Sequence, residues 1–226
     1  MKLILTCEHG GNHIPKKYKS YFKENQSILS THKGFDLGAL DMFNTLKQLS
    51  DYSNFSTTSR LLIELNRSLH HRNLFSEYSK PIPKAEKSIL INQYYLPYRN
   101  EVEQAIKKFI EMEKQVLHIS VHTFTPIINT VERNCDIGLL FNSSNSAEKG
   151  FCKQMKSEIK RLNPNLKTRY NYPYLGRADG FTTYLRKRFP ENYLGIELEV
   201  NQKFSKNNKL DSSIKQSLFE ALGQLI

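Results

Sequence analysis

The sequence predicts an α/β fold around a largely parallel sheet. Segments with the pattern of strands, Met1–Thr6, Gln115–Val121 and Tyr193–Gln202, are separated by stretches in which apolar residues recur at helical spacing. Strands that alternate with helices are typical of parallel sheets. The first two of these strands are closely followed by a histidine and a turn, and open α/β sheets bind ligands at the carboxyl ends of their strands. A chain of 226 residues forms one sizeable core more readily than two, so we expect a single domain over residues 1–226.

The composition excludes several classes of protein. A hydrophobic content of 38% and a charged content of 24% suit a folded domain better than a disordered chain. No apolar run approaches the ~20 residues that cross a bilayer. The N-terminal run, Leu3–Leu5, is too short for the core of a signal peptide. We therefore expect a cytoplasmic protein that does not enter a membrane.

The net charge of +11 raises the question of a polyanionic partner. Lys and Arg number 33 against 22 Asp and Glu, and such an excess can mark a nucleic-acid-binding protein. Many of the lysines, however, are scattered over predicted helix surfaces, and no RNA-binding signature or zinc finger accompanies them. We interpret the excess mainly as solvated surface that also attracts anionic substrates, and we do not expect a nucleic-acid partner.

The three cysteines, Cys7, Cys135 and Cys152, do not form a recognisable motif. Their number is odd and no CxxC spacing occurs, so neither a disulfide framework nor a structural zinc site is expected. Cys7 lies beside the candidate site described next. It could act as a nucleophile, but a small buried thiol is the more ordinary role.

The first strand leads into the candidate site. Met1–Thr6 is apolar and closes with a β-branched residue, and it is followed by Cys7-Glu8-His9-Gly10-Gly11-Asn12. Glycines let the backbone approach a ligand closely. A strand that ends in such a loop places its last polar side chains at the carboxyl edge of the sheet. His9 is therefore a candidate metal ligand; the alternative is a histidine that packs or caps beside a tight turn.

A helix is predicted to begin near Asp36, after a segment from Ile14 to Phe22 that is rich in lysine and tyrosine. Apolar residues recur at helical spacing from this point, at Leu37, Leu40, Phe43, Leu46 and Leu49. Asp36 lies at or just before the helix start, where an Asp often serves as an N-cap worth ~1 kcal/mol. Its alternative role is a metal carboxylate at the mouth of the site.

Residues 55–67 are predicted to form a strand with a polar exit, because apolar and polar residues alternate from Arg60 to Asn66. The Asn66-Arg67 pair at its end suits recognition of a carboxylate, since a guanidinium offers a planar fork of donors. The alternative is a surface arginine paired with Glu64. Residues 68–83 then form a long surface loop. Its adjacent histidines, His70-His71, would point in different directions and are not assigned to one metal.

The next helix and strand repeat the arrangement of the opening. Residues 89–114 carry an apolar stripe at helical spacing, and the strand Gln115–Val121 follows and runs into His122. Two parallel strands would bring His9 and His122 to the same edge of the sheet, which is the strongest signal in the pattern. His118 lies four residues earlier on the same strand, too far along it to join them, and is expected to be structural.

The C-terminal part completes the predicted fold. We expect a strand at Asp136–Phe141, a helix from Ser146 to Leu162, a turn-rich loop at Asn171–Phe181, a short helix at Thr182–Phe189 and a closing amphipathic helix at residues 211–226. On the strand between the last two helices, Glu197, Glu199 and Asn201 share one face. Crowding of two carboxylates raises a carboxyl pKa, as a general base requires.

In this order, the motifs resemble the N-formylglutamate amidohydrolase family over nearly the whole chain. They are Glu8-His9-Gly10-Gly11-Asn12, Ser59-Arg60-Leu61-Leu62, Asn66-Arg67, His122-Thr123-Phe124-Thr125-Pro126, Asp136-Ile137-Gly138, Asn171-Tyr172-Pro173-Tyr174 and Glu197-Leu198-Glu199-Val200-Asn201-Gln202. The resemblance implies a phosphorylase/hydrolase-like, zinc-carboxypeptidase-like fold: a three-layer α/β sandwich with a mixed, mainly parallel central sheet. It also implies metal-assisted hydrolysis of an amide bond.

The resemblance also implies a ligand set. In the wider carboxypeptidase group the first metal histidine is followed three residues later by a glutamate ligand, and this chain has Asn12 there. Neutral Asn is a poorer zinc ligand than a carboxylate. The expected ligands of a zinc ion are therefore His9, Asp36 and His122, with Glu8 as the alternative carboxylate.

The substrate-binding and catalytic residues follow from the same resemblance. Arg67 would bind the substrate carboxylate, and Glu199 would act as the general base that activates water, with Glu197 as the other candidate. The residues expected around the substrate, an N-acyl amino acid, are Arg67, Asn66, Arg60, Asn12, Arg133 and Tyr174.

Two functions remain as hypotheses at this point. The first is a zinc-dependent amidohydrolase that cleaves an N-acyl amino acid such as N-formylglutamate. The second is a non-catalytic basic protein on the same fold that binds nucleic acid or another polyanion, for which binding should fall steeply with salt.

Overall fold

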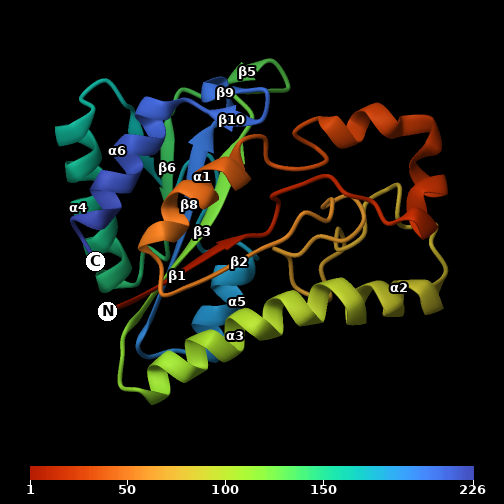
Figure 1. Ribbon diagram of the computed structural model, residues 1–226, viewed down its shortest axis with the longest axis horizontal. Coiled ribbons are helices and arrows are strands. Elements are labelled where there is room, and N and C mark those ends of the chain that lie inside the picture. Colours follow the sequence, from red (N-terminus) through yellow and green to blue (C-terminus); the bar gives the residue numbers. More distant parts are fainter.

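The computed structural model describes all residues from Met1 to Ile226 and has a six-stranded central sheet (Figure 1). The strand order is β2-β1-β3-β8-β6-β7. The strands are β1 (Lys2–Cys7), β2 (Tyr52–Phe55), β3 (Val116–Phe124), β6 (Ile137–Leu140), β7 (Thr168–Tyr170) and β8 (Tyr193–Asn201). The first four strands in this order are mutually parallel. β6 runs antiparallel to β8, and β7 is parallel to β6. The predicted mixed, mainly parallel sheet is confirmed.

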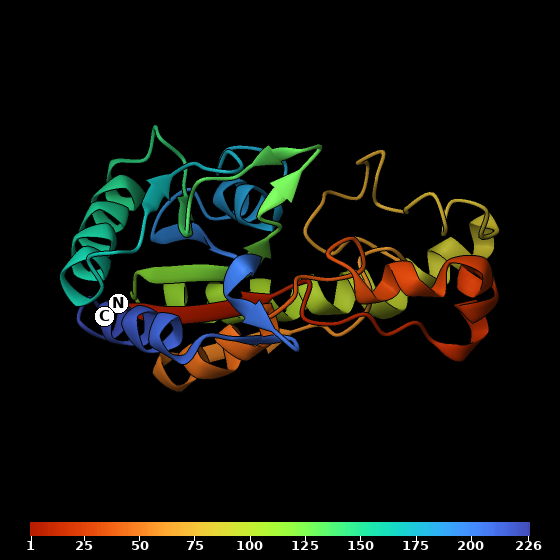
Figure 2. The same ribbon diagram turned by 90° about the horizontal axis from the view of Figure 1, so that it is seen from above.

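Helices cover both faces of the sheet, which gives the predicted three layers. One core joins the sheet to α1 (Ala39–Leu46), α4 (Ser146–Leu162) and α6 (Ser212–Gly223). The other core joins it to α2 (Lys84–Leu90), α3 (Leu96–Glu111), α5 (Phe181–Arg188) and the 3-10 segment η1 (Lys16–Ser30). Seen from above, η1 and α2 lie on the side of the molecule away from α4 and α6 (Figure 2).

The two faces of the sheet differ in polarity, and this difference positions the site. Along β3, Leu117, Ile119 and Val121 belong to the first core, while His118, Ser120 and His122 point to the opposite face and are also buried. Alternation of side chains along a strand separates the two sets. Buried polar groups need hydrogen-bond partners. The second face therefore carries a layer of paired polar side chains under its helices.

Residues 55–67 do not form the predicted strand. β2 ends at Phe55, and the chain runs on through turns to Pro83. The buried residues Leu62 and Ile63 are consecutive, so the burial does not alternate. The hydroxyl of Ser59 donates to the Gly34 carbonyl at 2.9 Å, and the Glu64 carboxylate accepts from the Asn66 N–H at 3.0 Å. Such bonds between side chains and backbone replace a strand ladder.

Most other predicted elements are present within a few residues of their predicted ends. α4 is capped by Asn145, whose side chain accepts from the N–H groups of Ala147 and Glu148 at 3.0 and 3.1 Å. The predicted helix over residues 89–114 is divided into α2, a π-helical turn η3 (Ile91–Tyr95) and α3. The remaining elements are η2 (Lys47–Leu49), β4 (Ile127–Ile128), β5 (Val131–Glu132), η4 (Gln202–Phe204), β9 (Ser205–Lys206) and β10 (Lys209–Leu210). None of the helices combines the length and the apolar character that crossing a bilayer requires.

Candidate metal centre and active site

Two histidines meet at the carboxyl edge of the sheet, as predicted. β1 and β3 are parallel neighbours, and Thr6 lies opposite Ser120 in their register. His9 follows the end of β1, and His122 lies near the end of β3, so the topology brings both side chains to one place. Their ring centroids are 4.9 Å apart, and both residues are 2% exposed.

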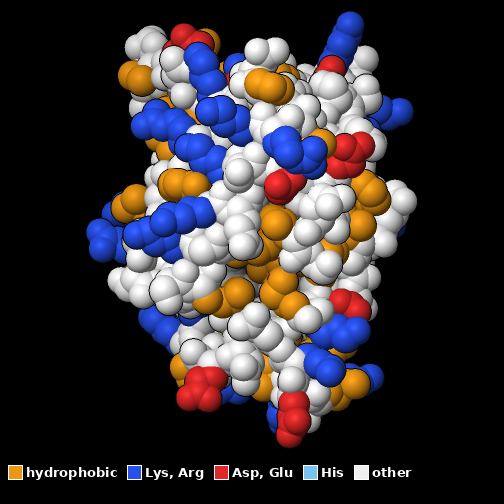
Figure 3. Space-filling view, turned by 90° about the vertical axis from the view of Figure 1, so that its left-hand side faces the viewer, with side chains coloured by type: hydrophobic (Ala, Val, Ile, Leu, Met, Phe, Trp, Pro, Cys, Tyr) orange, Lys and Arg blue, Asp and Glu red, His pale blue; other side chains and the backbone are white.

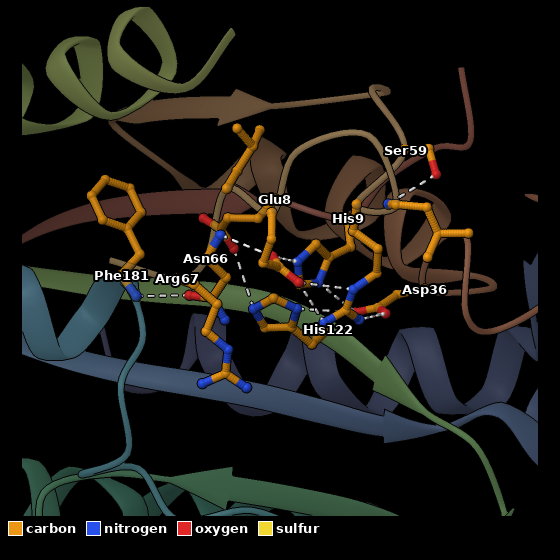
Figure 4. Close-up of polar contacts among 12 residues, drawn as sticks. Glu8, His9, Asp36, Ser59, Asn66, Arg67, His122 and Phe181 are labelled. Atoms are coloured by element: carbon orange, nitrogen blue, oxygen red, sulfur yellow. Dashed lines mark hydrogen bonds and ion pairs between the residues drawn. The ribbon is translucent and has the colours of Figure 1, made fainter. Parts of the chain in front are cut away.

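Asp36 joins the two histidines from the turn before α1. Its backbone N–H donates to the His9 carbonyl at 3.0 Å, which holds this turn against the end of β1. Its Oδ2 atom lies 3.3 Å from His9 Nδ1 and 3.0 Å from His122 Nδ1 (Figure 4). The N-cap of α1 is Gly38, which has a left-handed φ of 85°. The alternative that Asp36 caps the helix is therefore wrong.

The outer nitrogens of both imidazole rings face carboxylates. His9 Nε2 is hydrogen-bonded to Glu64 Oε1, and His122 Nε2 lies 3.2 Å from Glu8 Oε2 and 2.7 Å from Ser120 Oγ. Each ring therefore has a carboxylate on both sides, Glu64 or Glu8 at Nε2 and Asp36 at Nδ1. A histidine that binds a metal through Nδ1 donates its Nε2 proton to the outer carboxylate. In that tautomer the two Nδ1 lone pairs point at Asp36 Oδ2.

This donor set fits a divalent cation. One donor atom from each of His9, Asp36 and His122 lies within 4.8 Å of the other two. With both ring protons on Nε2, a cation among these three atoms would be bound by two imidazole lone pairs and a carboxylate oxygen. Two histidines and one carboxylate with an open fourth position are a set that catalytic zinc uses.

Glu8 is not part of this set. It is fully buried behind His122, where it accepts from Tyr98 OH at 3.0 Å and from Ser120 Oγ at 2.5 Å. Burial opposes its ionisation, but the hydrogen bonds from His122 and Ser120 outweigh burial and hold the pKa of Glu8 well below its usual range. The structure places this carboxylate as a support for His122, not beside Asp36.

Arg60 connects the carboxylates on the other side. It donates to Glu64 Oε2 through Nε and a terminal nitrogen, at 3.0 and 2.8 Å, and to Asp36 Oδ1 at 3.1 Å. Its guanidinium therefore neutralises two buried acids. Although burial opposes the charge, Glu64 and Asp36 raise the pKa of Arg60 above its usual value. Of the residues predicted to bind substrate, Arg60 makes the most side-chain hydrogen bonds within the protein.

A cavity of about 280 Å³ opens beside the histidines. Arg67 lines it and donates to the backbone carbonyl of Asp179, which also lines it. Beside it, Asn66 Oδ1 accepts from the Phe181 N–H at 2.7 Å (Figure 4). The remaining lining residues are His9, Asp36, Arg60, His122, Thr123, Tyr174, Leu175, Ala178, Asp179, Glu197 and Glu199.

Two glutamates of β8 reach the cavity from the sheet. Glu199 lies opposite His122 in the register of β3 and β8 and is 4% exposed. Its Oε2 atom is buried without a hydrogen-bond partner, and burial raises the pKa of Glu199 to about 8. Glu197 lies opposite Ser120, is half-buried, and accepts from Thr182 Oγ1 at 2.8 Å.

Several predicted residues lie elsewhere. Asn12 does not line the cavity; its side chain donates to the Leu29 carbonyl at 3.0 Å in a separate hollow against η1. Arg133 also does not line it but stands behind Tyr174, donating to that hydroxyl at 3.1 Å. His118 bonds to Thr6 and Tyr193. These three polar residues have structural partners of their own.

Cys7 is also outside the cavity. Its side chain belongs to the core on the opposite face of the sheet, and burial raises the pKa of its thiol well above the usual value. A thiolate is the reactive form of cysteine. The ordinary role of a buried thiol therefore describes Cys7.

Sequence reasoning missed four lining residues: Thr123, Leu175, Ala178 and Asp179. Thr123 directly follows His122 on β3, so its position could have been read from the motif. The other three belong to the turn-rich loop before α5, where only the Asp179-Gly180 pair gave a local signal, and that signal indicates a turn without indicating its direction.

The chain matches one protein-family model and several solved structures. The family model described as N-formylglutamate amidohydrolase matches residues 1–205. No curated protein matches the sequence. The solved structure of gene product Atu2144 from Agrobacterium tumefaciens aligns with a TM-score of 0.83 and 22% identity, over 99% of this chain and 90% of that one.

Two further solved structures align with the chain. N-formylglutamate amidohydrolase from Ralstonia eutropha JMP134 has a TM-score of 0.73 and 15% identity, over 99% of this chain and 92% of that one. A metallo-carboxypeptidase from Burkholderia cenocepacia has a TM-score of 0.40 and 12% identity, over 99% of this chain and 56% of that one. Because the family model covers most of the sequence, the chain belongs to the N-formylglutamate amidohydrolase family.

Proposed function

We propose that the protein is a zinc-dependent amidohydrolase that cleaves the amide bond of an N-formyl or related N-acyl amino acid. The observation that carries the proposal is the convergence of His9 Nδ1, His122 Nδ1 and Asp36 Oδ2 at the edge of the cavity. The family supports hydrolysis of this kind. The proposal includes a small-molecule substrate and a cytoplasmic location.

In the proposed reaction, water adds to the acyl carbon and the C–N bond breaks, which releases a carboxylic acid and an amino acid. A zinc ion held by His9, Asp36 and His122 would polarise the carbonyl and acidify the water. Glu199 takes a proton from the attacking water and passes it to the leaving amine nitrogen. Its buried, unpartnered Oε2 atom is suited to that exchange.

The direct test combines metal analysis with an activity screen. Purified protein is analysed for bound metals and then assayed for hydrolysis of N-formyl and N-acetyl amino acids, with and without a chelator. Zinc at about one equivalent, with activity that the chelator removes and added zinc restores, is the expected result. A metal-free protein that hydrolyses these amides equally well would contradict the proposal.

Arg67 is proposed to bind the substrate carboxylate. Its guanidinium is held over the cavity by the Asp179 carbonyl, and its own carbonyl accepts from Tyr95 OH at 2.7 Å and from Arg99 at 3.3 Å. These contacts hold both the guanidinium and the backbone of Arg67 in place. A guanidinium fixed in this way can bind a carboxylate without first being ordered.

Arg67→Ala should raise KM for carboxylate-bearing substrates about 10- to 100-fold, the worth of a hydrogen bond to a charged group. It should change kcat much less, since an ion pair present throughout the reaction contributes uniform binding. Steady-state kinetics would show the split. Arg177→Ala, on the exposed part of the nearby loop, is the matched control and should leave KM unchanged. An unchanged KM in Arg67→Ala would mean that another residue binds the substrate carboxylate.

Glu8→Gln should weaken zinc binding about 10- to 100-fold, the usual cost of losing a carboxylate that supports a metal-bound histidine. The amide keeps the shape of the side chain but removes the negative charge behind His122. The dissociation constant, measured by competition with a chelator, would report the loss. Exposed Glu132→Gln is the control. A lower melting temperature with unchanged zinc affinity would make Glu8 a purely structural residue.

The alternative of a non-catalytic basic protein has no support from the comparisons. On the face over α4 and α6, Lys and Arg side chains outnumber Asp and Glu but are interrupted by uncharged and apolar ones (Figure 3). This distribution agrees with the interpretation of the net charge as solvated surface.

A further inference from the structure

Arg99 of α3 is a buried cation without a carboxylate partner. The residue is 3% exposed, and both hydrogen bonds of its guanidinium go to backbone carbonyls. Its Nη2 atom is buried without a partner, and burial lowers the pKa of Arg99. The rings of Phe181, Tyr184 and Tyr95 surround the charge, with centroids 4.2, 4.5 and 4.9 Å from the guanidinium carbon. An apolar side chain of similar volume would avoid the cost of burying a charge. The distinctive contribution of Arg99 therefore lies in the hydrogen bonds that it donates.

These hydrogen bonds hold the backbone of the segment that carries Arg67. Arg99 Nη1 donates to the Leu65 carbonyl at 3.0 Å and to the Arg67 carbonyl at 3.3 Å. Neither carbonyl accepts a hydrogen bond from a backbone N–H, because residues 64–68 lie outside the helices and strands. Tyr95, four residues before Arg99, adds a bond from its OH to the Arg67 carbonyl at 2.7 Å. Side chains thus satisfy carbonyls that a strand ladder would otherwise pair.

The Arg99 guanidinium also contacts the start of α5, to which the same segment is bonded. Asn66 Oδ1 accepts from the Phe181 N–H at 2.7 Å (Figure 4), and the ring of Phe181 is the one nearest to the guanidinium of Arg99. Arg99 itself does not line the substrate cavity. Any effect of Arg99 on substrate must therefore pass through the segment that it holds.

We propose that Arg99 is a positioning residue for substrate binding: it fixes the backbone of Leu65 and Arg67, so that the Arg67 guanidinium is already in place for the substrate carboxylate. This inference rests on the proposed function and extends it to a residue that substrate does not touch. The Arg67 guanidinium makes one hydrogen bond within the protein, to a neutral carbonyl, so its charge stays available. A binding group that is ordered before the substrate arrives loses less conformational entropy on binding.

The zinc-binding set has supports of its own. Glu64, which contacts His9 Nε2, belongs to the same segment as Arg67 but accepts two hydrogen bonds from Arg60. Its own N–H donates to the Leu74 carbonyl at 2.9 Å. We therefore expect Arg99 variants to keep the zinc affinity of the wild-type protein, which separates positioning of Arg67 from a general loosening of the site.

The test is a double-mutant cycle of Arg99→Met and Arg67→Ala on zinc-loaded protein. KM and kcat are measured for N-formylglutamate and for any N-formyl amino acid that the activity screen shows to be hydrolysed faster. Arg99→Met alone should raise KM about 3- to 10-fold, the cost of ordering one long side chain on binding, and should change kcat much less. In the Arg67→Ala background it should raise KM no further, because residues that act through each other are not additive. Arg99→Lys keeps a charged donor and should raise KM less than Arg99→Met.

Hydrogen exchange gives a second readout that needs no substrate. Arg99→Met should speed the exchange of backbone N–H groups in residues 64–68, since the segment loses the donor of two hydrogen bonds. Mass spectrometry of a peptide that spans the segment would show the change. Arg169→Met is the matched control, because the guanidinium of Arg169 also lies over an aromatic ring, 4.0 Å from the centroid of Tyr172, but in β7. It should change neither KM nor the exchange of this segment.

The outcomes separate this inference from the proposed function. An equal rise of KM in both backgrounds, unchanged exchange of residues 64–68, or loss of zinc in Arg99→Met would each overturn the inference and leave the amidohydrolase intact. An unchanged KM in Arg67→Ala would do the same, since Arg99 would then have no binding residue to position. Hydrolysis of no N-formyl amino acid by the zinc-loaded wild-type protein would overturn the proposed function, and the inference with it.

Discussion

His122→Ala is expected to yield a folded protein that no longer retains zinc during purification. The substitution removes one of three ligands, which should cost more than the roughly 10- to 100-fold loss typical of a supporting partner. Elemental analysis and circular dichroism would show the loss of metal and the retention of the fold. His9→Ala and Asp36→Ala should behave in the same way, because each removes one donor atom from the same cluster.

The fold should survive because the partners of His122 keep other hydrogen bonds. Glu8 still accepts from Tyr98 and Ser120, and Asp36 still accepts from Arg60. The exposed His70→Ala is the matched control and should retain zinc. Full zinc occupancy in His122→Ala would remove this residue from the ligand set.

The histidine pair was predictable from the sequence because it depends only on topology. Two strands with His9 and His122 at or just beyond their carboxyl ends must bring them together if the strands are parallel neighbours, and helices between strands imply that arrangement. The role of Asp36 was not predictable in this way. An aspartate before a helix has the same local sequence pattern whether its side chain caps the helix or contacts residues of other strands. Here its partners lie 27 and 86 residues away.

The directions of the carboxylates around the histidines were also not predictable from the sequence pattern. Glu8 was expected as an alternative metal ligand because of its residue type and its place beside His9. Its direction is set by Tyr98, a residue of α3 that is 90 positions away. Likewise, the alternation over residues 55–67 predicted a strand. The polar residues there, Arg60 and Glu64, instead pair with each other and with the site. Tertiary partners outweigh local periodicity at both places.

Glu199→Gln is expected to lower kcat by a factor on the order of 10²–10⁴, the usual contribution of a general base. The glutamine is nearly isosteric and cannot accept the proton of the attacking water. The fold and bound zinc should be retained, because Glu199 makes no side-chain hydrogen bond that the substitution would break and lies outside the ligand cluster. Single-turnover kinetics on zinc-loaded protein would separate this loss from a loss of binding.

Glu197→Gln is the natural comparison, because both glutamates occupy the same face of β8 and both line the cavity. Glu199 is the better candidate because it lies opposite His122, whereas Glu197 lies two residues further from the edge, opposite Ser120, and already accepts from Thr182. Burial also raises the pKa of Glu199 to about 8, and a base works best with a pKa near the working pH. Wild-type kcat in Glu199→Gln beside an inactive Glu197→Gln would reverse the two roles. Loss of zinc in Glu199→Gln would instead make this residue a ligand.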